Sequence, residues 1–186
     1  MGVSQKKRGV VNRKRASIIL MQFEGKNKTE KYYFQNFNIR NKNYRIIFTK
    51  GHYTDPINMI ENLLREVEKE GLSVEDGDKA FCVFDTDTDI LKQQQIEIAY
   101  SKCAKNPIVE IIKSNPCFEI WFLLHFKFST KMFNSSDEVI NELKGFISEY
   151  EKNKDYYDSI IGNIETAILN AKRIEKHHLD LRKRFK

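Results

Sequence analysis

The stretch that decides the fold is Ala80-Phe81-Cys82-Val83-Phe84, which runs directly into Asp85-Thr86-Asp87-Thr88-Asp89. Its first half is a short apolar run, typical of a strand that is buried in a parallel sheet. Its second half places three carboxylates where the strand reaches the surface. Ligands of open α/β sheets collect outside the carboxyl ends of the strands, and Mg²⁺ takes carboxylate oxygens together with substrate phosphates. The stretch therefore predicts an α/β sheet with a cation site at a strand end.

The three aspartates differ in how strongly they indicate a metal ligand. Asp85 and Asp87 stand two residues apart in an extended segment, so their charges point to the same side and repel each other unless a cation lies between them. Asp89 directly precedes the apolar pair Ile90-Leu91, and it fits a helix N-cap as well as a metal ligand. Both interpretations of Asp89 stay open at this point.

Short apolar segments alternate with segments of helical spacing along the first two thirds of the chain. The expected strands are 17–23, 44–48, 79–84 and 108–112, and the expected helices are 30–37, 56–70 and 90–104. This alternation predicts an α/β fold, with a parallel sheet of about four strands flanked by helices. The strand ends then share one rim of the sheet, where Glu24 and Asp85 meet.

The segment 117–126 is too apolar for an exposed helix, although it contains Glu119 and His125. We expect a buried helix that brings Glu119 to the same rim. A buried carboxylate without a partner is costly, so Glu119 requires a cation, a basic side chain or a hydrogen bond. His125 fits a core histidine with satisfied hydrogen bonds better than a catalytic proton carrier.

Three regions are expected from composition and periodicity. Residues 1–16 are basic and lack hydrophobic periodicity, which predicts a flexible N-terminal arm. Residues 17–134 form the main domain, and residues 135–186 form a helical C-terminal extension packed on it.

The chain has 186 residues and a formal net charge of +6, and its basic residues are concentrated at the two ends. This distribution favours a polyanionic partner, and nucleic acid is the natural class. The basic residues expected to contact it are Arg13, Lys14, Arg15, Lys26 and Lys28.

No stretch has the roughly 18 apolar residues that a membrane span requires, and the N-terminus has no apolar signal-peptide core. Cys82, Cys103 and Cys117 are odd in number and lack metal-site spacing. We therefore expect a cytoplasmic protein with no membrane partner, whose cysteines are core thiols.

Three blocks of sequence resemble a known family. The first block is Phe23-Glu24-Gly25-Lys26-Asn27-Lys28-Thr29-Glu30-Lys31-Tyr32-Tyr33-Phe34, and the second is Val83-Phe84-Asp85-Thr86-Asp87. The third is Ser114-Asn115-Pro116-Cys117-Phe118-Glu119-Ile120-Trp121-Phe122-Leu123-Leu124-His125-Phe126. A Glu-Gly step after the first strand and an Asp-x-Asp after a later one resemble the Toprim domain, and all three blocks in order resemble RloB-like proteins of bacterial defence islands.

The resemblance implies a Toprim (Rossmann-like) fold and a Mg²⁺- or Mn²⁺-dependent nuclease that acts in anti-phage abortive infection. It also implies a partner ATPase of the ABC or AAA type encoded nearby. By analogy with overcoming-lysogenization-defect (OLD) nucleases, the implied metal-contacting residues are Glu24, Glu30, Asp85, Asp87, Ser114 and Glu119. Among them, Glu24, Asp85, Asp87 and Glu119 are the expected catalytic set, and Asp89 is an added candidate ligand.

Some assignments have structural alternatives. Glu30 lies two residues farther from Glu24 than in the OLD-type pattern, and a glutamate in a first helical turn is also favoured by the helix dipole. Ser114 fits a turn before Pro116 equally well. The alternative function is a non-catalytic module that senses nucleic acid or phosphate and docks a partner ATPase. The sequence does not decide between DNA and RNA as the substrate. It also leaves open whether the chain forms a homo-oligomer.

Overall fold

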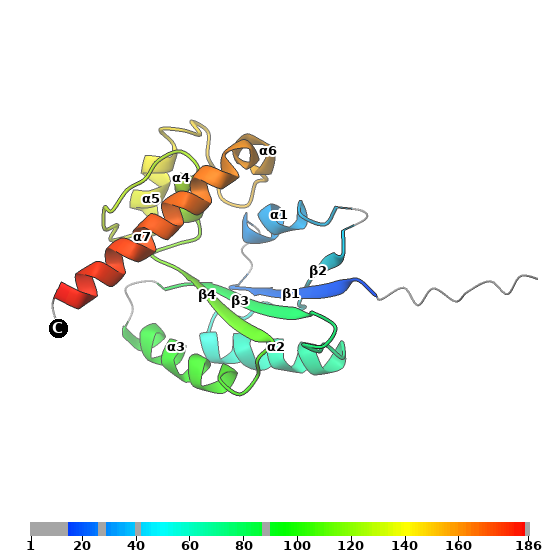
Figure 1. The fold of residues 1–186 in the computed structure, drawn as a ribbon. Coiled ribbons are helices and arrows are strands. Elements are labelled where there is room, and N and C mark those ends of the chain that lie inside the picture. Colours follow the sequence, from blue (N-terminus) through cyan, green and yellow to red (C-terminus); the bar gives the residue numbers. More distant parts are fainter. Residues whose placement is uncertain (1–14, 26–28, 40–41, 87–89, 185–186) are drawn as a thin grey trace, which may run out of the picture.

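The computed structural model describes residues 15–25, 29–39, 42–86 and 90–184, which form a parallel sheet with helices on both faces (Figure 1). Four strands lie in the order β2-β1-β3-β4, and every neighbouring pair is parallel. Their bounds are Ser17–Phe23 (β1), Tyr44–Phe48 (β2), Lys79–Asp85 (β3) and Val109–Ser114 (β4). The predicted four-stranded parallel α/β sheet is confirmed, although β4 begins one residue later and ends two residues later than expected.

Helices connect the strands and continue after the last one. The α-helices are α1 (Thr29–Gln35), α2 (Pro56–Lys69), α3 (Ile90–Cys103), α4 (Glu119–Leu124), α5 (Ser136–Leu143), α6 (Tyr157–Ile160) and α7 (Ile164–Arg184), with a 3₁₀ turn, η1 (Ile161–Asn163), before α7. In Figure 1, α2 and α3 cover one face of the sheet, while α1 and the helices from α4 onward lie on the other. No helix within the described ranges is long and apolar enough to cross a membrane.

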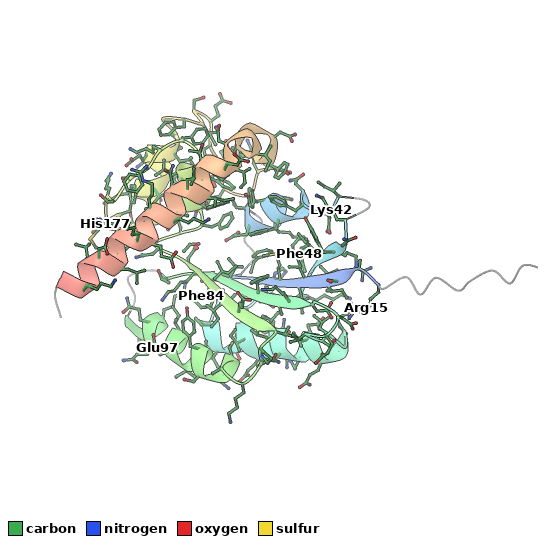
Figure 2. The ribbon with its side chains drawn as sticks, in the orientation of Figure 1. Arg15, Lys42, Phe48, Phe84, Glu97 and His177 are labelled. Atoms are coloured by element: carbon green, nitrogen blue, oxygen red, sulfur yellow. The ribbon has the colours of Figure 1, made fainter. Side chains whose placement is uncertain are left out.

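The alternation of side chains along β1 builds a core on each face of the sheet. Ile18 and Leu20 pack with the apolar side of α2, whereas Met21 and Phe23 belong to the cluster on the α1 side. Successive strand residues point to opposite faces, so one strand that is apolar throughout can serve both layers. Figure 2 shows side chains filling the space between the sheet and both helical layers.

Local sequence explains how α2 is set against the sheet. The Asp55 carboxylate accepts hydrogen bonds from the backbone N–H groups of Ile57 and Asn58, and Pro56 occupies the first helical position. The fully buried residues Met59, Ile60 and Leu63 then follow helical spacing and face the sheet. The predicted start of this helix is confirmed.

The C-terminal helices share a core with α1 and α4. This core contains Tyr33 of α1, Phe122 of α4, Leu143 of α5 and Ile160 of α6, together with Tyr150. The sequence predicts a helical extension over residues 135–186, but α5 ends at Leu143 and Tyr150 lies in a segment of turns. The apolar residues of that segment are buried by tertiary packing instead, which a periodic pattern does not distinguish from a helix.

The strand order creates a switch point between β1 and β3. From β1 the chain passes through α1 to β2 on one side, and from β3 it passes through α3 to β4 on the other. The segments that leave β1 and β3 therefore diverge, and side chains at these two strand ends are left facing each other. Ligands of doubly wound sheets bind at such a position.

Candidate functional site

Glu24 and Asp85 meet at the switch point. Glu24 follows the last residue of β1, and Asp85 is the last residue of β3. The backbone N–H of Asp85 donates a hydrogen bond of 3.2 Å to Glu24 Oε2. The structure thus brings together the two carboxylates that the sequence places on one rim.

Lys92, in the first turn of α3, neutralises Glu24. Its Nζ lies 2.9 Å from both Oε1 and Oε2 of Glu24. The Lys92 side chain is 10% exposed and that of Glu24 is 23% exposed, so the ion pair is largely removed from water. An ion pair of this kind is screened much less than one on the surface.

Asp85 and one further carboxylate, Glu30, each have one buried oxygen without a hydrogen-bond partner in the described part of the chain. Oε2 of Glu30 and Oδ1 of Asp85 are buried and have no partner among the described residues. Glu30 lies in the first turn of α1, and only 3% of the residue is exposed. Buried polar atoms are normally satisfied, so two orphaned oxygens in neighbouring carboxylates indicate a site that receives a ligand.

The pKa values of these two groups reflect their burial and their neighbours. Burial is the main cause that raises the pKa of Glu30 to about 7, and the charge of Glu119 contributes to this rise. Burial likewise raises the pKa of Asp85 to about 8, with added repulsion from Glu30, Glu119 and Glu24. Lys152 opposes the shift in both cases. Strongly raised carboxyl pKa values are common where negative charge has been concentrated for function.

Glu119 completes the group and is contacted by the C-terminal part of the chain. It is the first residue of α4 and is 1% exposed. The Tyr150 hydroxyl donates a hydrogen bond of 2.9 Å to Glu119 Oε1, and Lys152 Nζ lies 3.8 Å from the same oxygen. The charge of Glu119 also raises the pKa of the Tyr150 hydroxyl, in addition to the effect of burial. The four carboxylates Glu24, Glu30, Asp85 and Glu119 are called the carboxylate site below.

The same C-terminal segment fixes the start of α1. The backbone N–H of Asn153 donates a hydrogen bond of 3.0 Å to Thr29 Oγ1, and Asn153 has a φ of 64°. Asparagine is one of the few residues that adopt this left-handed conformation readily. The contact joins the turn that carries Lys152 to the helix that carries Glu30.

Ser114 lies at the carboxyl end of β4, directly opposite Asp85 in the strand pairing. Its carbonyl accepts hydrogen bonds from the backbone N–H and the hydroxyl of Thr86, at 2.8 and 3.0 Å. These bonds hold the chain as it leaves β3. The role of Ser114 as a metal ligand stays a prediction.

Several predicted residues fall outside the described part of the structure, namely Asp87, Asp89, Lys26, Lys28, Arg13 and Lys14. Among the residues that are described, no three His, Cys, Asp or Glu side chains already converge closely enough to hold a metal ion. Mutually repelling carboxylates stay apart without a counter-charge, so a cation here would have to draw them together.

Two other candidates have structural partners. Arg15 forms ion pairs with Asp76 at 2.7 Å and with the buried Asp78 at 2.6 Å, and Figure 2 shows it beside the start of β1. Its contact with nucleic acid stays a prediction. His125 is buried, its Nδ1 donates to the Trp121 carbonyl at 2.9 Å, and burial lowers its pKa. Nε2 of His125 is also buried and has no hydrogen-bond partner among the described residues, so the histidine lies in the core but only one of its ring nitrogens is hydrogen-bonded.

Sequence reasoning missed three residues of this neighbourhood: Lys92, Tyr150 and Lys152. Lys92 could have been found, since it stands at the start of the helix that follows the acidic stretch and so must lie near the strand ends. Tyr150 and Lys152 come from a segment that matches no motif, and only the packing of the C-terminal part on α4 brings them to Glu119.

The fold and the site together define a Rossmann-like α/β protein with buried carboxylates at the switch point of a parallel sheet. The sequence matches the model of a family described as RloB-like protein over residues 19–185. The chain therefore belongs to the RloB-like family. No curated protein and no solved structure matches it.

Proposed function

We propose that this chain is a metal-dependent nuclease of the Toprim type that hydrolyses phosphodiester bonds in nucleic acid. The observation that carries the proposal is the pair of buried, partnerless oxygens, Glu30 Oε2 and Asp85 Oδ1, beside the buried Glu119. Uncompensated buried carboxylates are costly for folding. Mg²⁺ or Mn²⁺ would compensate them, because hard cations prefer oxygen ligands.

The residues present fit a divalent cation in charge and in donor type. Asp85, Glu30 and Glu119 would hold it, and Asp87, Asp89 and Ser114 are further expected ligands. When bound, the cation would polarise a phosphodiester and lower the pKa of a water molecule. Glu24 either completes the metal site or acts as general base toward that water.

Nucleic acid as the substrate is supported by the charge on α7. Lys172 and Lys176 are exposed and have no ion-pair partner among the described residues. Arg173 lies between them in sequence, with its guanidinium 3.8 Å from the centre of the Phe128 ring. The helix is attached to α4 by a hydrogen bond of 2.9 Å from Asn170 Nδ2 to the Leu124 carbonyl. Phosphate backbones bind to exposed basic side chains of this kind.

The biological setting follows from the family resemblance. We propose a role in anti-phage defence by abortive infection, together with an ABC- or AAA-type ATPase encoded nearby. A cytoplasmic location is supported by Cys82, Cys103 and Cys117, which are all buried free thiols.

A cleavage assay tests the proposal. End-labelled DNA and RNA pools would be incubated with the protein in Mg²⁺, in Mn²⁺ or in EDTA, and the Asp85→Ala variant would be compared with the wild type. We expect cleavage that requires the metal and is lost in the variant. Cleavage that survives both EDTA and the substitution would exclude a metal-dependent nuclease centred on Asp85.

The alternative is a non-catalytic module that senses nucleic acid or phosphate. It is favoured by Lys152, which lies beside Glu119 with its side chain 37% exposed and could bind a phosphate. In that case neither metal would support cleavage, while binding of labelled nucleic acid would persist without metal and would fall in a Lys152→Ala variant.

A further inference from the structure

The two ends of the carboxylate site differ in how their charge is balanced. Both oxygens of Glu24 are engaged by Lys92 at 2.9 Å, and one also accepts the Asp85 N–H. A metal ion at Glu24 would have to displace an ammonium group that is itself only 10% exposed. At the Glu24 end of the site, the ammonium group of Lys92 already supplies the positive charge.

The other end lacks a comparable partner. Glu30 and Asp85 each present a buried oxygen with no hydrogen-bond partner, and Glu119 is 1% exposed. The basic group near this end is Lys152, whose Nζ is 3.8 Å from Glu119 and whose side chain is 37% exposed. Its long contact and its exposure make it a weak counter-charge.

The charge balance of the described side chains indicates how many ions fit. Four carboxylates, Glu24, Glu30, Asp85 and Glu119, face two ammonium groups, Lys92 and Lys152. When all four carboxylates are ionised, two negative charges remain without compensation. A single divalent cation supplies that charge for the described side chains, and Asp87 and Asp89, which lie outside them, are not part of this balance.

We propose that Lys92 serves as a built-in second cation, so that the chain binds one divalent metal ion, between Asp85, Glu30 and Glu119, instead of two. The inference rests on the proposed metal-dependent function and specifies its site. Two-metal phosphodiester hydrolysis uses a pair of cations to stabilise the attacking and the leaving oxygens. Here the ammonium of Lys92 takes the place of the cation on the Glu24 side, and Lys92 positions Glu24 by pairing with both of its oxygens.

The number of bound metal ions tests the inference directly. Mn²⁺ binding would be counted by the loss of the free-ion electron paramagnetic resonance signal, and Mg²⁺ binding by isothermal titration calorimetry. We expect one ion per wild-type chain and two ions per chain in the Lys92→Met variant, which exposes Glu24 to metal. The control is Lys102→Met, which removes a lysine on the same helix that pairs with Glu61 at 2.6 Å, and which should bind one ion.

The outcomes separate this inference from the proposed function. Two ions in the wild type would overturn the role of Lys92 and leave a metal-dependent nuclease standing, whereas no bound ion would overturn both. An unchanged count of one in a folded Lys92→Met protein would also overturn it.

A second variant avoids leaving Glu24 unpaired. The double substitution Glu24→Gln with Lys92→Met removes both charges of the pair at once and keeps the balance of the site. We expect it to bind one Mn²⁺ with a dissociation constant within about threefold of the wild type, while Asp85→Asn weakens binding by more than about tenfold. A double variant that loses metal as completely as Asp85→Asn would show that Glu24 is a ligand and would refute the inference.

Discussion

Tyr150 donates a buried hydrogen bond of 2.9 Å to Glu119, across 31 residues of sequence. Glu119 begins α4, which follows the last strand of the sheet, whereas Tyr150 lies between α5 and α6. The C-terminal part of the chain therefore contributes to the carboxylate site. It cannot be regarded as a separate appendage, because it holds one of the site's acidic side chains in place.

Replacing Tyr150 by Phe should destabilise the protein. The substitution keeps the ring but leaves a buried Glu119 oxygen without its donor, which typically costs about 1–3 kcal/mol. Urea unfolding followed by circular dichroism would measure the change in the free energy of unfolding. The matched control is Tyr156→Phe, because Tyr156 bonds the backbone of Glu149 and Glu151 at exposed positions where water can substitute. Equal losses in both variants would contradict the special role of Tyr150.

The parallel sheet and the meeting of Glu24 with Asp85 could be predicted from sequence because both depend on short-range patterns. Apolar runs of strand length alternate with helical spacing, and parallel strands place their carboxyl ends on one edge. The start of α2 could equally be predicted, because Asp55 as the N-cap and Pro56 at the first helical position are local signals of a helix start.

The partners of the carboxylates were harder to predict because they depend on tertiary packing. Lys92 carries no motif: its place at the start of α3 puts it near the strand ends, but its pairing with Glu24 depends on how the helix packs on the sheet. Tyr150 falls within the extension that was predicted to be helical, although it lies between two helices and its burial comes from contact with α4 and α6. A hydrophobic pattern records that a side chain is buried and does not record what buries it.

The metal-free protein should lose stability as the pH rises from about 5 to about 8. The folded protein holds protons on Glu30 and Asp85 up to pKa values of about 7 and about 8, while the unfolded chain releases them near 4.5 and 3.8. Between these limits the native state binds more protons than the unfolded state, so the free energy of unfolding decreases with rising pH. Each unit of pKa difference corresponds to about 1.4 kcal/mol.

Urea unfolding in EDTA at several pH values would measure this slope. The Glu30→Gln/Asp85→Asn double variant should show a flatter dependence over the same range, because it has no carboxyl groups there to titrate. Added Mg²⁺ should restore stability to the wild type at pH 8 and have little effect on the variant. A wild-type slope that matches the slope of the variant would show that neither carboxyl holds a proton at neutral pH.

Asp78 and Arg15 should contribute to stability at the start of the sheet. Burial alone raises the pKa of Asp78, but hydrogen bonds from Arg15 and from the backbone N–H groups of Ile18 and Ser73 lower it to about 2. The carboxylate is therefore stabilising above pH 4, and this contribution is lost as the pH falls through about 2. Asp78→Asn should lower the free energy of unfolding at pH 7 by about 2 kcal/mol.

The Arg15→Ala variant tests whether Arg15 stabilises the fold or binds nucleic acid. Because the guanidinium lies 2.6 Å from Asp78 and 2.7 Å from Asp76, its removal should lower the thermal midpoint of unfolding. Differential scanning calorimetry and nucleic-acid binding would be measured on the same preparation. An unchanged midpoint together with weakened binding would assign Arg15 to nucleic acid instead of to the fold.

The exposed lysines of α7 should set the salt dependence of nucleic-acid binding. Each phosphate contact releases condensed counterions, so the logarithm of the binding constant falls against the logarithm of the salt concentration, with a slope of about −0.9 per contact on duplex DNA. Replacing Lys172 and Lys176 by Ala should weaken binding and make this slope shallower by one to two such contacts. Fluorescence anisotropy at several salt concentrations would measure both effects.

The control for α7 replaces two lysines elsewhere on the surface. Lys69 of α2 pairs with Glu66 at 3.0 Å, and Lys79 of β3 pairs with Glu110 at 2.9 Å, so each already has a counter-charge. The Lys69→Ala/Lys79→Ala variant has the same net charge as the α7 variant, which separates local contact from overall attraction. Equal slopes in the two variants would show that binding follows net charge and that α7 is not the contact surface.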